Sequence, residues 1–201
     1  MEEPEQIRRK KTMEINNVDT FYPKTKQEWR NWLEENHLTK TSVWLIQYNK
    51  KSNKPSIGWS DAVDEALCFG WIDSIRKKLD DDSTIQFFSK RKDKSTWSKI
   101  NKQKVEKFTE LNLMAPAGLE RINIAKLNGC WELLDSVEAL IIPDDLEEAL
   151  RSKDGALEFF QNLSKSKQKA ALHRLVMART KETREKRLKE ILELCEKGQQ
   201  K

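Results

Sequence analysis

The sequence predicts an α+β protein, in which a small antiparallel sheet with covering helices is followed by a helical C-terminal part. Segments rich in β-branched and aromatic residues occur only in the first half, at 41–48, 71–79 and 84–89. Apolar residues at helical spacing occur throughout, and they are the only regular pattern beyond residue 113. We therefore expect a flexible basic tail over 1–19, an α+β domain over 20–113 and a helical region over 114–198.

The individual elements follow from local signals. Hydroxyl side chains that precede apolar periodic stretches are expected to cap helices, at Thr25, Ser60, Ser95, Ser152, Ser164 and Thr180. Pro116 and Pro143 suit the first turn of a helix, and Gly70 is placed to end one in a left-handed conformation. The three consecutive aspartates at 80–82 predict the turn of a hairpin between the second and third strands.

Composition excludes several classes of protein. The chain of 201 residues is 37% hydrophobic and 35% charged, and its seven tryptophans argue against disorder. Three cysteines without a CxxC pair disfavour a disulfide framework or a zinc site. No apolar run is long enough for a membrane span, and the first residues do not resemble a secretory signal. We expect a cytoplasmic protein.

Unusual residue choices concentrate between Ser60 and Asn101, and they predict a pocket for a small anionic ligand or a contact with a protein partner. Guanidinium groups bind carboxylates and phosphates, and hydroxyl groups at a helix start add hydrogen-bond donors. Asp73 could orient one of the arginines. The candidate ligand-binding residues are Trp71, Asp73, Arg76, Arg91, Ser95, Trp97, Ser98 and Asn101. The alternative is a capped helix beside an exposed basic loop, with no ligand.

Two other functions stay open. The chain could be an enzyme of unknown reaction that uses Asp73 or Cys68, but Cys68 lies near the C-terminal end of a predicted helix, which raises a thiol pKa. We expect no catalytic residues, cofactor or metal.

The segment 86–107 carries eight cations and two anions and could bind nucleic acid. The sequence has no RNP motif, GxxG loop or zinc spacing, which disfavours this function.

Four motifs in this order resemble one family: EALCFGWIDS at 65–74, FFSKRKDKSTWSKIN at 87–101, MAPAG at 114–118 and IPDDLEEAL at 142–150. They are similar to the YdeI/OmpD-associated, or bacteriocin-protection, family over about residues 25–198. The resemblance implies a bacterial or archaeal stress-protection protein related to the YjbR/CyaY-like superfamily, with a frataxin-like antiparallel sheet backed by helices. It implies no particular reaction. The positions that match the family's motifs are Trp71, Asp73, Arg91, Ser95, Trp97, Ser98 and Asn101.

Overall fold

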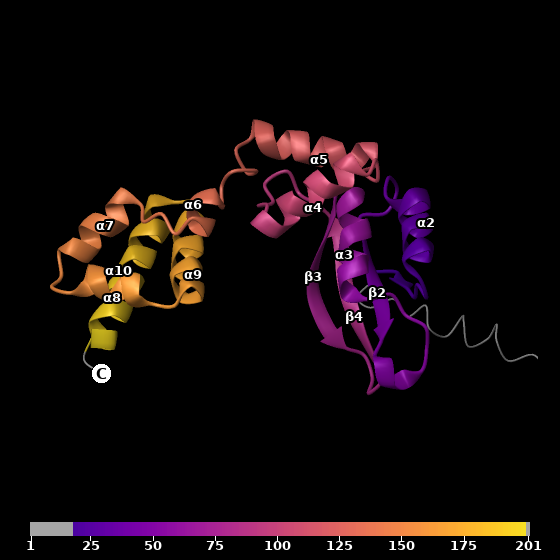
Figure 1. The fold of residues 1–201 in the computed structure, drawn as a ribbon, viewed down its shortest axis with the longest axis horizontal. Helices are drawn as coiled ribbons and strands as arrows, with labels where there is room; N and C mark the ends of the chain where they lie inside the picture. Colours follow the sequence, from indigo (N-terminus) through magenta and orange to yellow (C-terminus); the bar gives the residue numbers. More distant parts are fainter. Residues whose placement is uncertain (1–17, 200–201) are drawn as a thin grey trace, which may run out of the picture. The chain divides into compact units, whose positions relative to one another are not determined.

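The computed structural model describes residues 18–199, which divide into two compact units (Figure 1). The first unit comprises the described residues up to Ser95 together with Ile100–Asn128, and the second comprises Thr96–Lys99 and the residues from Gly129 onward. The division falls after residue 128, whereas the sequence places a boundary after residue 113. The predicted basic tail lies, except for its last two residues, outside the described part of the chain.

The first unit contains the sheet and the helices next to it. Its strands are β1 (Thr20–Phe21), β2 (Ser42–Tyr48), β3 (Trp71–Lys78) and β4 (Ser83–Lys90). Its helices are α2 (Lys26–Asn36), the short 3₁₀ helix η1 (Lys50–Ser52), α3 (Trp59–Cys68), α4 (Lys99–Glu110), whose first residue belongs to the second unit, and α5 (Pro116–Leu127). The three predicted strands and the hairpin turn at 80–82 are confirmed.

The four strands form one sheet in the order β1-β2-β4-β3. β2 pairs antiparallel with β4, and β4 pairs antiparallel with β3. β1 pairs in parallel with β2, so the expectation of a purely antiparallel sheet is wrong at this edge. The two residues of β1 carry no alternating pattern that could have revealed them, because a strand this short depends on its partner for its existence.

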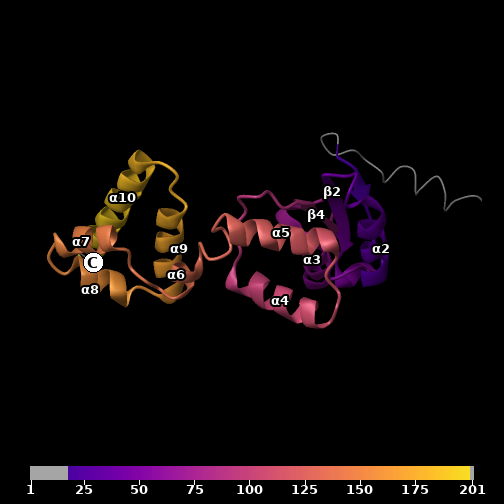
Figure 2. The same ribbon diagram turned by 90° about the horizontal axis from the view of Figure 1, so that it is seen from above.

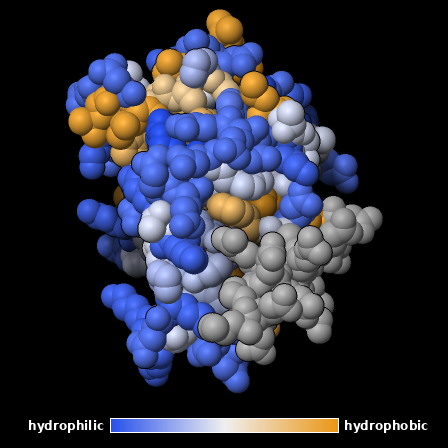
Figure 3. Space-filling model, turned by 90° about the vertical axis from the view of Figure 1, so that its right-hand side faces the viewer, coloured by the Kyte–Doolittle hydropathy of each residue, from blue (hydrophilic) through white to orange (hydrophobic). Residues whose placement is uncertain are grey.

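α2 and α3 cover one face of the sheet. The indole N–H of Trp29 in α2 donates to the carbonyl of Ala62 in α3 (3.0 Å), which ties the two helices together. The opposite face carries a smaller apolar cluster built on Trp44, Ile46 and Ile85. The surface seen in Figure 3 is largely hydrophilic, with apolar residues in separate patches.

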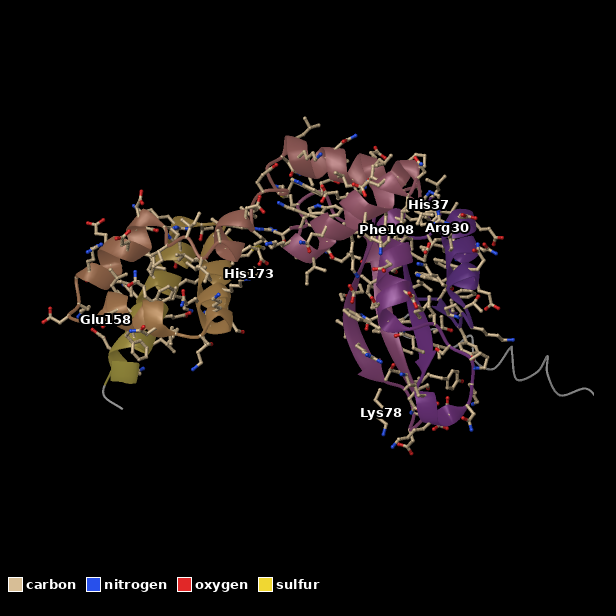
Figure 4. The ribbon with its side chains drawn as sticks, in the orientation of Figure 1. Arg30, His37, Lys78, Phe108, Glu158 and His173 are labelled. Atoms are coloured by element: carbon tan, nitrogen blue, oxygen red, sulfur yellow. The ribbon has the colours of Figure 1, made fainter. Side chains whose placement is uncertain are left out.

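A buried carboxylate strengthens the joint between α2 and α3. Glu65 in α3 is 3% exposed and accepts from Arg30 of α2 (2.7 Å), with Lys26 at 3.2 Å. Arg30, labelled in Figure 4, also donates to the carbonyl of Leu113 (3.0 Å). One carboxylate thereby connects two helices directly and, through Arg30, the segment that leads into α5.

α5 packs closely on the C-terminal end of α3. A Cβ atom at Gly118 would lie 2.2 Å from the carbonyl oxygen of Cys68, so only glycine permits this approach. Gly70 adopts φ +72°, which confirms the predicted left-handed end of α3 and turns the chain directly into β3. In both ribbon views α4 lies beside α5 (Figures 1 and 2).

The second unit contains helices only. They are α6 (Asp135–Glu138), α7 (Asp144–Arg151), α8 (Ala156–Asn162), α9 (Lys165–Val176) and α10 (Lys181–Gln199). α10 contacts α7, α8 and α9, and the enclosed core is mainly aliphatic with Phe160 at full burial. The prediction of a mixed α/β protein with a helical C-terminal part is confirmed.

Some of the predicted caps are confirmed and others are wrong. Thr25, Ser164 and Thr180 accept backbone N–H groups as expected. The predicted cap at Ser60 is wrong, because α3 begins two residues earlier than expected, at Trp59 with Gly58 as its N-cap, and glycine is tolerated at that position at little cost.

Ser95 and Ser152 do not cap the helices that follow them. The backbone N–H of Ser95 donates to the carbonyl of Lys92 (2.9 Å) in a turn, and α4 starts only at Lys99, directly after Ser98. Ser152 ends α7, and its hydroxyl donates to the carbonyl of Ala149 (2.7 Å). The hydroxyl of Ser152 thus bonds to a carbonyl that precedes it, and local sequence patterns do not distinguish this from capping.

Candidate functional site

Two of the predicted site residues are part of the core of the first unit. Trp71 is 1% exposed, and its ring meets that of Trp32 edge-on at 5.8 Å. Arg91 is 3% exposed, and its backbone N–H donates to the carbonyl of Gly70 (2.9 Å). Burial lowers the pKa of the Arg91 guanidinium to about 10, and the carboxylate of Asp73 acts in the opposite direction.

The remaining predicted residues are divided between the two units. Trp97 and Ser98 belong to the second unit, where Trp97 is 1% exposed and its ring lies 5.1 Å from that of Trp131. Ser95 and Asn101 belong to the first unit and are half-buried. These residues were grouped because they are close in sequence. Closeness in sequence does not show that neighbouring residues of this loop belong to different units.

Asp73 and Arg76 are brought together with other polar groups at the accessible edge of the sheet. β3 is an edge strand, and its residues from Ser74 to Lys78 are exposed. Asp73 Oδ2 accepts from the indole N–H of Trp59 (3.1 Å) and from the Gln86 side chain (3.3 Å). Arg76 donates from Nε and Nη2 to the hydroxyl of Thr84 (3.3 and 3.1 Å). A register shift between Asp73 and Arg76 interrupts the ladder at this point.

These residues share one face of the sheet. Directly opposed residues of antiparallel strands point to the same side. Asp73 opposes Phe88, Arg76 opposes Gln86, and Thr84 opposes Gln47 of β2. This is the side of the helices, because the ring of Phe88 packs at 5.4 Å from that of Trp29 in α2. We call the group the polar cluster; its members are Gln47, Trp59, Asp73, Arg76, Thr84 and Gln86.

Several members of the polar cluster are deeply buried. Gln86 is 1% exposed, and its amide donates to the carbonyl of Ser74 (3.2 Å) as well as to Asp73. This one buried side chain therefore fixes both Asp73 and the irregular part of β3. Gln47 is 4% exposed and donates to the carbonyl of Ile57 (3.3 Å). Within the described residues, Gln47 Oε1 has no donor. A buried acceptor of this kind can take a hydrogen bond from a bound molecule or from water.

Trp59 supplies an aromatic surface to the same group. It is the first residue of α3, it is 50% exposed, and its ring is oriented by the hydrogen bond to Asp73. Sequence reasoning missed Trp59, Gln47, Thr84 and Gln86. A signal was present for the last three, since polar residues stand at alternate strand positions where a helix-covered sheet face takes apolar ones.

The basic segment 86–107 is less available than its sequence suggests. Arg91 is buried, Lys104 pairs with Asp64 (2.5 Å), and the ammonium of Lys90 donates to the carbonyl of Leu38 (2.8 Å). Lys92, Lys94 and Lys99 are exposed. The segment also crosses the division between the two units.

The thiol of Cys68 is poorly suited to nucleophilic chemistry. Burial, and next the carboxylate of Glu65, raise the pKa of this thiol to about 11. The thiolate is the reactive form, and at neutral pH it amounts to about one part in ten thousand. In the described part of the chain, no group of three or more His, Cys, Asp or Glu side chains is arranged to hold a metal ion.

Residues 21–121 match the family model described as a domain of unknown function, DUF8412, which covers half of the chain. The chain belongs to this DUF8412 family. Residues 139–198 match a second model, described as Bacteriocin-protection, YdeI or OmpD-Associated. Neither the curated proteins nor the solved structures contain a match to the chain.

The two matches correct the extent of the resemblance seen in the sequence. The likeness to the YdeI/OmpD-associated family is confirmed over 139–198, where the IPDDLEEAL motif lies. The other three motifs fall within the DUF8412 match instead. The bacteriocin-protection match supports a stress-protection type of role for this DUF8412 chain. No helix among residues 18–199 combines the length and apolarity needed to cross a membrane.

Proposed function

We propose that this chain is a non-catalytic binding protein of the stress-protection type, which holds a small anionic ligand at the polar cluster of its first unit. The observation that carries the proposal is the exposed ring of Trp59, fixed by Asp73, which is itself held by the buried Gln86. An aromatic side chain that is half exposed and also oriented by a charge is pre-organised for contact, because little conformational entropy remains to be lost on binding.

Arg76 supports an anion as the ligand. Its guanidinium bonds to the neutral hydroxyl of Thr84, and among the described residues no carboxylate forms an ion pair with it. Its positive charge therefore remains available, and its planar fork suits a carboxylate or a phosphate. Gln47 and Arg76 lie on strands separated only by β4 and are offset by two residues along it, so their Cα atoms are about 12 Å apart, which suits a small molecule.

The test is a thermal-shift screen of the full chain against small carboxylic acids, sugar phosphates and nucleotides. A ligand that binds only the folded state raises the melting temperature by mass action. We expect a hit that is lost in Arg76→Ala and weakened in Trp59→Ala. Lys77→Ala is the matched control, because Lys77 is also an exposed cation of β3 but lies over the ring of Trp44 on the other face.

A hit that survives Arg76→Ala, or that Lys77→Ala removes equally, would rule out the polar cluster as the site. Absence of any shift across the panel with the parent chain would count against a small anionic ligand. A protein partner, the other possibility that the sequence leaves open, would then become the subject of the test.

The enzyme alternative is tested at Cys68. Iodoacetamide at pH 7.5 should modify the half-buried Cys130 first and leave the buried Cys68 and Cys195 intact in the native protein, as mass spectrometry of peptides would report. Rapid alkylation of Cys68 would favour a reactive thiol. The relation to the YjbR/CyaY-like superfamily and its frataxin-like sheet remains a prediction, as does the cytoplasmic location.

A further inference from the structure

The helical unit separates its charges along the chain. Residues 130–164 carry nine acidic and two basic side chains, whereas residues 165–189 carry ten lysines or arginines and two glutamates. α9 itself carries three lysines, an arginine and a histidine, and no carboxylate. The basic window 165–189 has a larger net positive charge than segment 86–107, and it lies within one unit.

The cations of α9 form two rows along its surface. Lys165, Lys169 and His173 follow one another at intervals of four residues, and Lys167 and Arg174 are seven apart. The line between these rows is formed by the small, exposed residues Ser166 and Ala170. Gln168, Leu172 and Leu175 face the core on the opposite side of the helix, so the basic rows belong to its outer part.

Only part of this charge is neutralised within the unit. Lys169 pairs with Glu138 of α6 (2.6 Å), and Arg174 pairs with Glu190 of α10. Lys165, Lys167 and Arg179 are exposed, and no carboxylate of the described residues pairs with any of them. Glu158 on α8 is well separated from His173 on α9 (Figure 4). A persistent positive potential over α9 follows.

We infer that the outer surface of α9 binds the phosphate backbone of a nucleic acid without reading its sequence. A helix with two rows of cations and small residues between them lets a polyanion approach closely, and counterion release then supplies the binding free energy. An anionic membrane is the other large polyanion, but helices that lie on membranes place exposed apolar side chains beside their cations. The exposed large apolar residues of this unit are Leu133, Ile141 and Leu194, none of them on α9.

The experiment measures fluorescence anisotropy of a labelled 20-base-pair DNA duplex with the full chain at 50–200 mM salt. The variant, called the α9 triple, carries Lys165→Ala and Lys167→Ala on α9 and Arg179→Ala just beyond its C-terminal end. All three are exposed cations whose removal breaks no ion pair of the described structure. The matched control carries Lys92→Ala, Lys94→Ala and Lys99→Ala, three exposed cations of segment 86–107. Circular dichroism confirms that both triple variants are folded.

We expect the parent chain and the control triple to bind alike, and the α9 triple to bind at least about tenfold more weakly at 50 mM salt. The slope of log K against log salt should fall by about one for each cation removed, which is the signature of lost phosphate contacts. The inference is overturned if the parent does not bind at 50 mM salt, or if the α9 triple binds as tightly as the control. It is also overturned if vesicles of anionic lipid capture the parent chain and the duplex does not.

Discussion

The two units of this protein differ in where they place their polar side chains. The first unit buries them: Glu65, Gln47 and Gln86 are at most 4% exposed and are held by hydrogen bonds across elements far apart in sequence. The second unit keeps nearly all charge at its surface around an aliphatic core, and Gln168 is its one buried polar residue among those described.

This difference places different binding chemistry in each unit. A sheet edge with buried polar groups beneath it can orient individual donors and acceptors, which small ligands require. A helical surface with exposed lysines offers charge on long side chains, which suits an extended polyanion. The two family matches follow the same division, since one covers 21–121 and the other 139–198.

The largest loss of stability in each unit is expected from removing one aromatic ring from its core. Phe160→Ala in the second unit and Phe88→Ala in the first each create a cavity at a site with no exposure. Each should lower the free energy of unfolding by about 3–5 kcal/mol. Urea unfolding followed by far-UV circular dichroism measures the loss. A loss below about 1 kcal/mol for either variant would show that its core is packed loosely.

The second prediction concerns the buried carboxylate of the first unit. Glu65→Gln removes the charge that holds Arg30 and Lys26, and it should cost about 1.5–3 kcal/mol because hydrogen bonds to charged groups are lost in a buried position. Glu34→Gln is the matched control, since Glu34 is 52% exposed and also pairs with Arg30 (3.2 Å).

The control should cost no more than about 0.5 kcal/mol, as helix-surface pairs do. Both values come from urea denaturation at neutral pH. If the two substitutions cost the same, burial does not distinguish the two carboxylates and the comparison between the units loses its main support.

The smallest effect is expected at the ion pair of the second unit. Arg184 donates to both oxygens of Asp145 (2.6 and 2.8 Å), and this bonding, mainly, lowers the pKa of the Asp145 carboxyl. Both side chains are about one-third exposed or more, so Asp145→Asn should cost less than about 1 kcal/mol.

The pH dependence of that loss has a definite sign. A lowered pKa means that the contribution is complete above the unfolded pKa of about 3.9 and is lost as pH falls through the folded value. Parent and Asp145→Asn should therefore differ at pH 7 and converge in melting temperature below about pH 4. A difference that persists at pH 2 would point to packing rather than charge.

Local sequence patterns were sufficient for most of the helices and strands. The cap at Thr25, the left-handed Gly70, the hairpin around 80–82 and the start of α9 after Ser164 each depend on a few neighbouring residues. α6 was not expected, because its four residues are too short to show a helical period. The sequence also singled out Asp73 and Arg76, which the structure places in the polar cluster.

What only the tertiary structure decided is which of the unusual residues reach the surface together. Arg91 and Trp97 carry suggestive side chains, yet both are buried, and they fall in different units. Trp59 lies beside Asp73 because α3 packs against β3. Gln47 faces the same side as Arg76 because β4 pairs with both of their strands. Strand pairing and helix packing join residues far apart in the chain, so no local pattern determines them.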